Sequence, residues 1–185
     1  MELDNLIIEC SKNNRKAQSA LFEQYKDTLY FLALKYCRNS VEAEDTLHDA
    51  FLTIFQNIKS FRGKGSFEGW MKRIVIYKAI DKYKQKRPIV AQINDQHSEE
   101  TQIENGLEHY PLEDLLRHIQ ELPDRYRLVF NLYQMDGYTH KEIAKALGIS
   151  VSTSKSNYHR AKLQLKQKIE ASLHQPELKN TPYGT

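Results

Sequence analysis

The sequence predicts an all-α fold made of two small helical domains that a flexible linker joins. Apolar residues recur at spacings of three and four in nearly every stretch, which is the pattern of an amphipathic helix. No stretch alternates apolar and polar residues as a half-buried strand does. One interval, residues 88–111, has little periodicity and is acidic. We therefore expect domains at 1–87 and 112–173, an acidic linker at 88–111 and a tail at 174–185.

Local signals bound the four helices that we expect in the first domain. The Asn39–Ser40 pair offers an N-cap to the third helix, and Pro88 stops the fourth. Glycines within 63–69 predict a loop before the fourth helix. The apolar stripes place the helices at residues 3–10, 17–36, 41–58 and about 70–86.

In the second domain, helices at 112–122 and 126–133 lead into a helix-turn-helix signature. Thr139 and Glu142 have the T-x-x-E spacing of a capping box, which starts a helix. Gly148 suits a turn with left-handed backbone, and the helix that follows would lie in the major groove of DNA. The alternative interpretation of this motif is a helical hairpin that binds no DNA.

The second helix of the motif, which Ser150 caps, exposes polar and basic side chains. We expect Ser154, Tyr158, Ala161 and Leu165 to face inward. The candidate contacts to phosphates and base edges from the two helices are Thr139, Lys141, Ser152, Thr153, Lys155, Ser156, Asn157 and Arg160.

The net charge of +3 conceals an uneven distribution along the 185 residues. The net charge is −2 over residues 1–60, +7 over 61–87, −8 over 88–124 and +6 over 125–185. Two basic blocks separated by an acidic stretch predict two surfaces that meet a polyanion, kept apart by a segment that repels it.

The sequence argues against a membrane protein, a secreted protein and an enzyme. The densest apolar clusters are about one helical turn long, and the N-terminus lacks the basic segment of a secretory signal. Cys10 and Cys37 lie among apolar neighbours without metal-ligand spacing, so we expect reduced core residues. The glycines at 63–69 fit neither a P-loop nor a dinucleotide fingerprint. We therefore expect a cytoplasmic protein with no catalytic residues, metal, cofactor or small-molecule substrate.

The second domain resembles region four of the extracytoplasmic-function (ECF) sigma factors, in the segments ELPDRYRLVFNLYQMDGYT and GYTHKEIAKALGISVSTSKSNYHRAKLQL. These proteins are the promoter-recognition subunits of bacterial RNA polymerase. The first domain resembles region two of the same family, in AEDTLHDAFLTIF and SFEGWMKRIVIYKAIDKYKQKR. The resemblance covers about residues 15–173. It implies core RNA polymerase and promoter DNA as partners, and an anti-sigma factor as a further partner.

One face of the helix at 41–58 predicts a protein-binding surface. Acidic side chains and an exposed leucine recur at spacings that form one stripe on a helix, and such a face suits a protein better than DNA. The alternative is an ordinary solvated face. The resemblance implies that this stripe docks on the clamp of the polymerase, and that the second domain contacts the flap. The residues of the stripe are Asp45, His48, Asp49, Leu52 and Gln56.

The basic block after that helix interleaves cations with aromatic side chains, a combination that binds single-stranded nucleic acid. The loop at 62–69 could shape a pocket for a flipped base. By periodicity alone, Trp70 is more often a core residue. The candidate contacts to the minus-ten promoter element are Arg62, Lys64, Ser66, Phe67, Trp70, Lys72, Arg73, Tyr77, Lys78, Lys82 and Lys84.

These features predict an alternative sigma factor that binds core polymerase and directs promoter-specific initiation. The first domain would open the minus-ten element, and the second would read the minus-thirty-five element. The main alternative is a stand-alone two-domain helix-turn-helix regulator that binds a palindrome as a dimer without polymerase.

Overall fold

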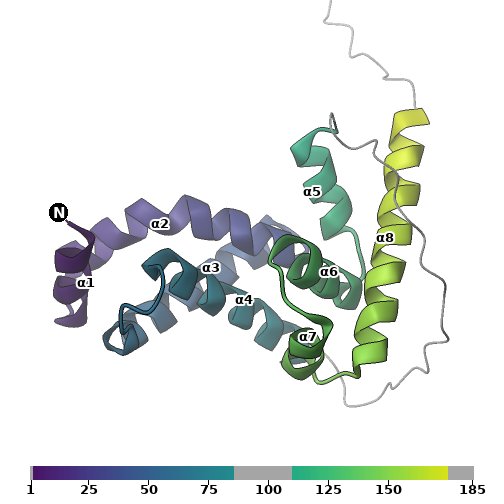
Figure 1. The fold of residues 1–185 in the computed structure, drawn as a ribbon. Helices are drawn as coiled ribbons and strands as arrows, with labels where there is room; N and C mark the ends of the chain where they lie inside the picture. The colour runs from purple at the N-terminus through teal and green to yellow at the C-terminus, as the bar shows by residue number, and fades with distance from the viewer. Residues whose placement is uncertain (1, 86–109, 175–185) are drawn as a thin grey trace, which may run out of the picture.

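In the computed structural model, residues 2–85 and 110–174 are described, and they form eight α-helices without a strand (Figure 1). This confirms the predicted all-α fold. Most of the predicted linker, the stop at Pro88 and the tail from residue 175 lie outside the described residues. Within the described ranges, no helix is both long and apolar enough to cross a membrane.

The first group of helices has nearly the bounds that the sequence predicts. Asn39 caps α3 by accepting a hydrogen bond from the Glu42 backbone N–H at 2.9 Å. α4 begins before the expected Trp70, because the Ser66 hydroxyl accepts a hydrogen bond from the Gly69 N–H at 3.0 Å and starts the helix earlier. The elements of this group are α1 at Leu3–Ser11, α2 at Arg15–Tyr36, α3 at Ser40–Asn57, a 3-10 turn at Ile58–Ser60 and α4 at Phe67–Gln85.

The larger apolar core lies between α2, α3 and α4. α2 packs along both of the other helices. Leu29 on α2, Ile54 on α3 and Met71 on α4 are fully buried. Cys10 and Cys37 are free thiols inside this core, as predicted, and burial raises the pKa of each.

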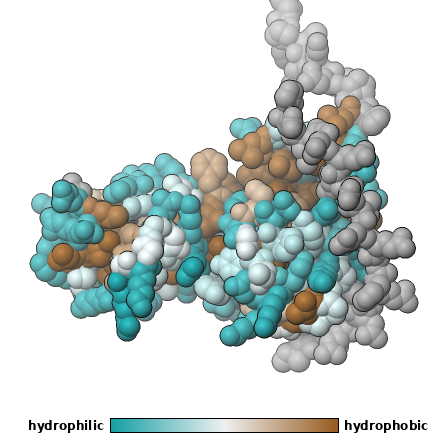
Figure 2. Space-filling model, in the orientation of Figure 1, coloured by the Kyte–Doolittle hydropathy of each residue, from teal (hydrophilic) through white to brown (hydrophobic). Residues whose placement is uncertain are grey.

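The second group of helices is built around α8, which stands upright at the edge of the molecule in Figure 1. α6 packs on α8 over a small core that includes Tyr126, Ala161 and Leu165. Figure 2 shows apolar side chains gathering over α5, where Leu112 is 76% exposed. The elements are α5 at Leu112–Gln120, α6 at Asp124–Phe130, a π-helical turn η2 at Asn131–Met135, α7 at His140–Leu147 and α8 at Val151–His174.

The two groups of helices pack directly against each other, which the sequence does not predict. α2 contacts α5 and α6, and α4 contacts α7. Leu128, Val129 and Leu132 of the second group are buried in the same continuous core as the side chains of α2, α3 and α4. Apolar residues that periodicity assigns to a separate second core therefore close the first one.

The C-terminal end of α2 makes the main polar contact between the groups. A helix leaves its last four carbonyl oxygens without a partner inside the helix. In α2, the first of these belongs to Ala33 and accepts a hydrogen bond from the Cys37 N–H at 2.9 Å. The other three accept from side chains of the second group: Leu34 from Gln120 Nε2 at 3.1 Å, Lys35 from Asn131 Nδ2 at 2.6 Å and Tyr36 from Arg127 Nε at 3.1 Å.

Arg127 is 2% exposed, so protein groups have to satisfy the charge of its guanidinium. It also donates to the carbonyl oxygens of Gln120 and Leu122, at 2.9 and 2.8 Å, and to the carboxylate of Asp124. Asp124 accepts a further pair of hydrogen bonds from Arg38. Burial acts to raise the pKa of Asp124, but the hydrogen bonds and charges of the two arginines outweigh burial and lower it.

Asp136 makes the second charged contact at this end of α2. Its carboxylate accepts a hydrogen bond from the Tyr36 hydroxyl and pairs with Lys35 Nζ at 3.4 Å. Burial, and then the charge of Asp136, raises the pKa of the Tyr36 hydroxyl. The hydroxyl therefore stays protonated and remains a donor.

Shortening a buried side chain in the larger core should lower the free energy of unfolding. Leu29→Ala should lower the free energy of unfolding by about 2–5 kcal/mol, because the fully buried side chain leaves a cavity. Urea unfolding measures the change. Leu52→Ala is the matched control, because Leu52 is 61% exposed, and it should change stability by less than about 0.5 kcal/mol. A loss at Leu29 no larger than that of the control would contradict this core.

Candidate nucleic-acid interface

α7 and α8 form the helix-turn-helix, and its predicted turn signals are confirmed. The Thr139 hydroxyl accepts a hydrogen bond from the Glu142 N–H at 3.3 Å, and the Thr139 N–H donates to Glu142 Oε2 at 2.8 Å. Gly148 ends α7 with a φ of 67°, in the left-handed region. The Ser150 hydroxyl accepts from the Thr153 N–H at 2.9 Å and so starts α8.

His140 joins the two helices of the motif. Its Nδ1 lies 2.9 Å from the Ser154 hydroxyl on α8, and its ring stacks on Tyr133 with centroids 4.2 Å apart. Burial, followed by the charge of Lys155, lowers the pKa of His140 below its ordinary value of 6.5. A neutral ring therefore holds α7 against α8 near pH 7. His140 is not among the predicted site residues, because a single histidine in a helix carries no pattern of its own.

The outer face of α8 carries the predicted residues with one exception. Asn157 is 2% exposed, so the prediction that its side chain is free to meet DNA is wrong. Ser154, Ala161 and Leu165 are buried as predicted, and Asn157 lies in the same inward stripe because it follows Ser154 by one helical turn. The other predicted contacts are exposed at Thr139, Lys141, Ser152 and Lys155, and half-buried at Thr153, Ser156 and Arg160.

The loop before α4 is exposed, but the aromatic ring that follows it is not. Phe67 is 3% exposed, and its ring centroid lies 5.4 Å from that of Trp70 and 5.1 Å from that of Phe61. Phe67 therefore belongs to the core, which contradicts its prediction as a contact to the minus-ten element. Trp70 is half-buried beside it. The exposed loop residues among the predicted contacts are Arg62, Lys64 and Ser66.

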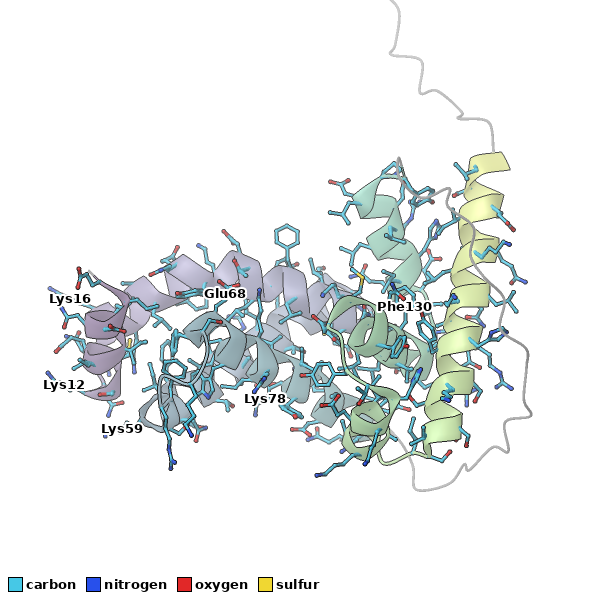
Figure 3. The ribbon with its side chains drawn as sticks, viewed as in Figure 1. Lys12, Lys16, Lys59, Glu68, Lys78 and Phe130 are labelled. Atoms are coloured by element: carbon cyan, nitrogen blue, oxygen red, sulfur yellow. The ribbon has the colours of Figure 1, made fainter. Side chains whose placement is uncertain are left out.

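The outer face of α4 carries the predicted basic residues. Figure 3 shows Lys78 projecting from α4 on the side away from α2. Lys72 pairs with Glu68 at 2.6 Å, and Lys82 pairs with Asp49 of α3 at 2.9 Å. On this face, three residues are exposed, Arg73, Tyr77 and Lys84, and three are half-buried, Lys72, Lys78 and Lys82.

The predicted stripe of α3 reaches solvent along its whole length. Its members are exposed at Asp45, His48, Leu52 and Gln56, and half-buried at Asp49. The large apolar side chain of Leu52 is 61% exposed between polar neighbours. Because Lys82 binds Asp49, the acidic stripe and the basic face of α4 adjoin each other.

A groove of about 500 Å³ lies where α4 meets the second group of helices. The residues that line it include Lys72, Arg73 and Tyr77 from α4 and Asp136, Tyr138 and Glu142 from the chain around α7. Residues of one predicted DNA surface therefore share this groove with residues that precede or begin α7. The sequence does not predict this juxtaposition, because it depends on how the two groups dock.

Comparisons with known proteins match both halves of the chain to one family. The family model of Sigma-70 region 2 matches residues 21–89, and that of Sigma-70 region 4 matches residues 112–165. The chain is 29% identical over 182 residues to the ECF RNA polymerase sigma factor SigW of Bacillus subtilis, over 91% of this chain and 97% of that protein. It is 25% identical over 181 residues to the ECF RNA polymerase sigma-E factor of Escherichia coli, over 90% and 94% of the two chains.

One solved structure has a similar fold. The sigma factor RpoE of Bartonella quintana, in a complex with the anti-sigma factor NepR, matches with a TM-score of 0.51 and 18% identity. The match covers 82% of this chain and 96% of that one.

The lowered pKa of His140 predicts a dependence of stability on pH. The contribution of neutral His140 to the free energy of unfolding is complete above the unfolded-state pKa of the ring. It is lost as the pH falls through the lower folded-state pKa. The wild type should therefore lose more unfolding free energy than His140→Gln between about pH 7.5 and about pH 5, as measured by urea unfolding. His48→Gln, at an exposed position, should keep the wild-type dependence. Equal losses in the wild type and His140→Gln would disprove this role.

Proposed function

This chain belongs to the extracytoplasmic-function sigma factors of the sigma-70 family, and from this premise we propose which of its surfaces contact polymerase and which contact each promoter element. It is a non-catalytic subunit that binds core RNA polymerase and directs promoter-specific initiation as an alternative sigma factor. The observation that carries the assignment is that both regions occur in one chain, in that order. A stand-alone helix-turn-helix regulator would leave the region-two match without a role.

The exposed stripe of α3 is the proposed contact to the polymerase clamp. Leu52 supplies exposed apolar area, and the acidic side chains of Asp45 and Asp49 lie on its N-terminal side along α3. Protein interfaces commonly combine a central apolar anchor with a polar rim. His48 and Gln56 complete the stripe. The second domain would contact the flap.

The loop at 62–66 and the outer face of α4 are the proposed contacts to the minus-ten element. Arg62, Lys64 and Arg73 are exposed cations that can follow phosphates. Tyr77 is 51% exposed and offers a ring on which a base can stack. Trp70 is half-buried and is the second aromatic side chain of this proposed surface, and the buried ring of Phe67 stacks against it.

The outer face of α8 is the proposed reader of the minus-thirty-five element. Ser152 and Lys155 near its N-terminal end are exposed, which is the part of a recognition helix that reaches base edges. Arg160 lies further along the helix, half-buried, with Nη1 3.5 Å from the Tyr126 hydroxyl. Asn157 is left out of this surface because it faces inward.

The remaining assignments are also proposals. The domains would extend over 1–87 and 112–173, joined by the acidic linker at 88–111 and followed by the tail at 174–185. The similar sigma factor of Bartonella quintana is bound by an anti-sigma factor, and we propose a partner of that kind here. The site of action would be the bacterial cytoplasm, where the polymerase works.

A run-off transcription assay tests the function directly. Core RNA polymerase with this protein should produce a discrete transcript from ECF-type promoters, and core polymerase alone should not. Tight binding of the isolated protein to a palindromic duplex, with no transcript on any such promoter, would instead support the stand-alone regulator.

Leu52→Ala tests the polymerase contact. Loss of this exposed apolar anchor should weaken core binding by about 1–2 kcal/mol, or about 5- to 30-fold, because anchors at the centre of an interface carry most of its energy. Titration of core polymerase with labelled protein measures it. Ile8→Ala is the control, because Ile8 is 51% exposed and lies on α1, outside the predicted stripe, and it should bind as the wild type does. Equal affinity of Leu52→Ala and the control would remove Leu52 from the interface.

Lys155→Ala tests the proposed minus-thirty-five reader. The variant holoenzyme should bind promoter duplex more weakly, and the slope of log affinity against log salt should fall by about one, because one phosphate contact is lost. Fluorescence anisotropy over a salt series measures both. Lys166→Ala, further along α8, is the matched control and should keep the wild-type slope. An unchanged slope in Lys155→Ala would argue against a phosphate contact.

A further inference from the structure

We propose that one end of the first group of helices is a third promoter surface, which binds backbone phosphates of the single strand downstream of the minus-ten element. This inference rests on the proposed function. The surface lies where the turn between α1 and α2 meets the 3-10 turn at Ile58–Ser60, which α1 contacts. We call this surface the basic end. It consists of Lys12, Arg15, Lys16 and Lys59, all of which are exposed.

The fold assembles the basic end from two separate stretches of the chain. Residues 1–60 together carry a net charge of −2, so the charge of this segment does not reveal a basic surface. The contact of α1 with Ile58–Ser60 brings Lys59 to the end of the molecule where α1 stops and α2 starts. Figure 3 shows Lys12, Lys16 and Lys59 at this same end of the first group. The tertiary structure therefore concentrates cations that the sequence keeps apart.

Three of these four cations have no carboxylate partner among the described residues. Lys12 pairs with Glu9, at 2.8 Å, whereas Arg15, Lys16 and Lys59 form no ion pair within the part of the chain that the structure describes. Exposed cations that the protein leaves unpaired are available to neutralise phosphates and to release the counterions that surround them. The basic end is therefore suited to a polyanion.

The positions of Arg15 and Lys16 oppose the stability of α2. Both lie in the first turn of this helix of 22 residues, and that turn has no acidic side chain. The helix dipole is positive at this end, so cations there are unfavourable. Asn14 already accepts hydrogen bonds from the N–H groups of Lys16 and Ala17, at 3.0 and 3.4 Å, so the cationic side chains, and not the helix backbone, would bind an anion. Residues that oppose local stability without a compensating contact are expected at functional sites.

The order of the elements places the basic end on the downstream side of the minus-ten surface. The chain that continues from the C-terminal end of α4 leads to the second group of helices, which would read the upstream element. The N-terminal end of α4 and the loop at 62–66 therefore lie on the downstream side, and Lys59 lies three residues before Arg62 of this loop. A single strand that follows the cations of α4 and of the loop reaches the basic end next.

The triple variant Arg15→Gln, Lys16→Gln, Lys59→Gln tests the basic end in the holoenzyme. Two fluorescein-labelled probes contain the same promoter duplex: in the short probe one strand ends at the minus-ten element, and in the long probe it continues single-stranded for about 10 nucleotides. On the long probe, the slope of log affinity against log salt should become shallower by about two, because each phosphate contact to a single strand contributes about 0.7. The wild type's advantage should therefore shrink about 16-fold between about 50 and about 200 mM salt.

The short probe and a second triple variant are the controls. The short probe does not reach the basic end, so the variant and the wild type should bind it equally. Lys26→Gln, Lys166→Gln, Lys168→Gln removes the same number of cations, each of which pairs with a carboxylate outside the proposed surfaces. It should keep the wild-type slope on both probes.

Lys16→Glu separates DNA binding from folding. A carboxylate in the first turn of α2 interacts favourably with the helix dipole, so this variant should unfold at a higher urea concentration than the wild type. It should nevertheless bind the long probe more weakly than the wild type does, because a phosphate would meet a negative charge. Lys26→Glu makes the same change of charge in the middle of α2 and should show neither effect.

An unchanged salt slope of the first triple variant on the long probe would overturn the proposal. An equal loss on both probes would also overturn it, and so would weaker binding to core polymerase without DNA, since the basic end would then contact the minus-ten element or the polymerase. The proposed function is judged separately by the wild type. A wild-type holoenzyme that binds neither probe refutes the minus-ten assignment, and the basic end with it. A wild type that binds both probes, together with a triple variant that behaves identically, refutes the basic end alone.

Discussion

Three successive carbonyl oxygens at the end of α2 need hydrogen-bond donors once the second group of helices covers them, and leaving one unpaired would cost about 1–3 kcal/mol. Gln120, Arg127 and Asn131 supply these donors from α5, α6 and η2. Satisfying one helix end therefore positions three elements of the other group. The placement of α7 beside α4, and the groove between them, follow from this contact.

This arrangement brings together the surfaces that are proposed to contact polymerase and promoter DNA. The acidic stripe of α3 adjoins the basic face of α4 through the Asp49–Lys82 pair, and residues around α7 line a groove together with residues of α4. Most of these contacts are polar or charged, and many are partly exposed. Such contacts hold a defined docked state, yet water and salt compete with them more readily than with an apolar core.

Much of the fold and of the candidate site could be predicted from local patterns. The capping box at Thr139, the left-handed Gly148 and the Asn39 cap are set by neighbouring residues, so the sequence shows them directly. The prediction of Phe67 as a minus-ten contact was wrong because the sequence does not distinguish an aromatic residue of a core from one of a binding surface. The prediction of Asn157 as a DNA contact was also wrong, since the residue is buried. Its spacing from Ser154 and Ala161 indicates the inward stripe, but its amide side chain suggested a contact to a base.

The sequence by itself determined the helices, their caps, the helix-turn-helix and the alternation of charge, because these depend on residues a few positions apart. Only the tertiary structure decided that the two groups share one core and that Arg127 is buried at their junction. The physical reason is that α2 and α6 are distant along the chain. Periodicity shows which face of each helix is apolar, but not which distant face or helix end it will cover.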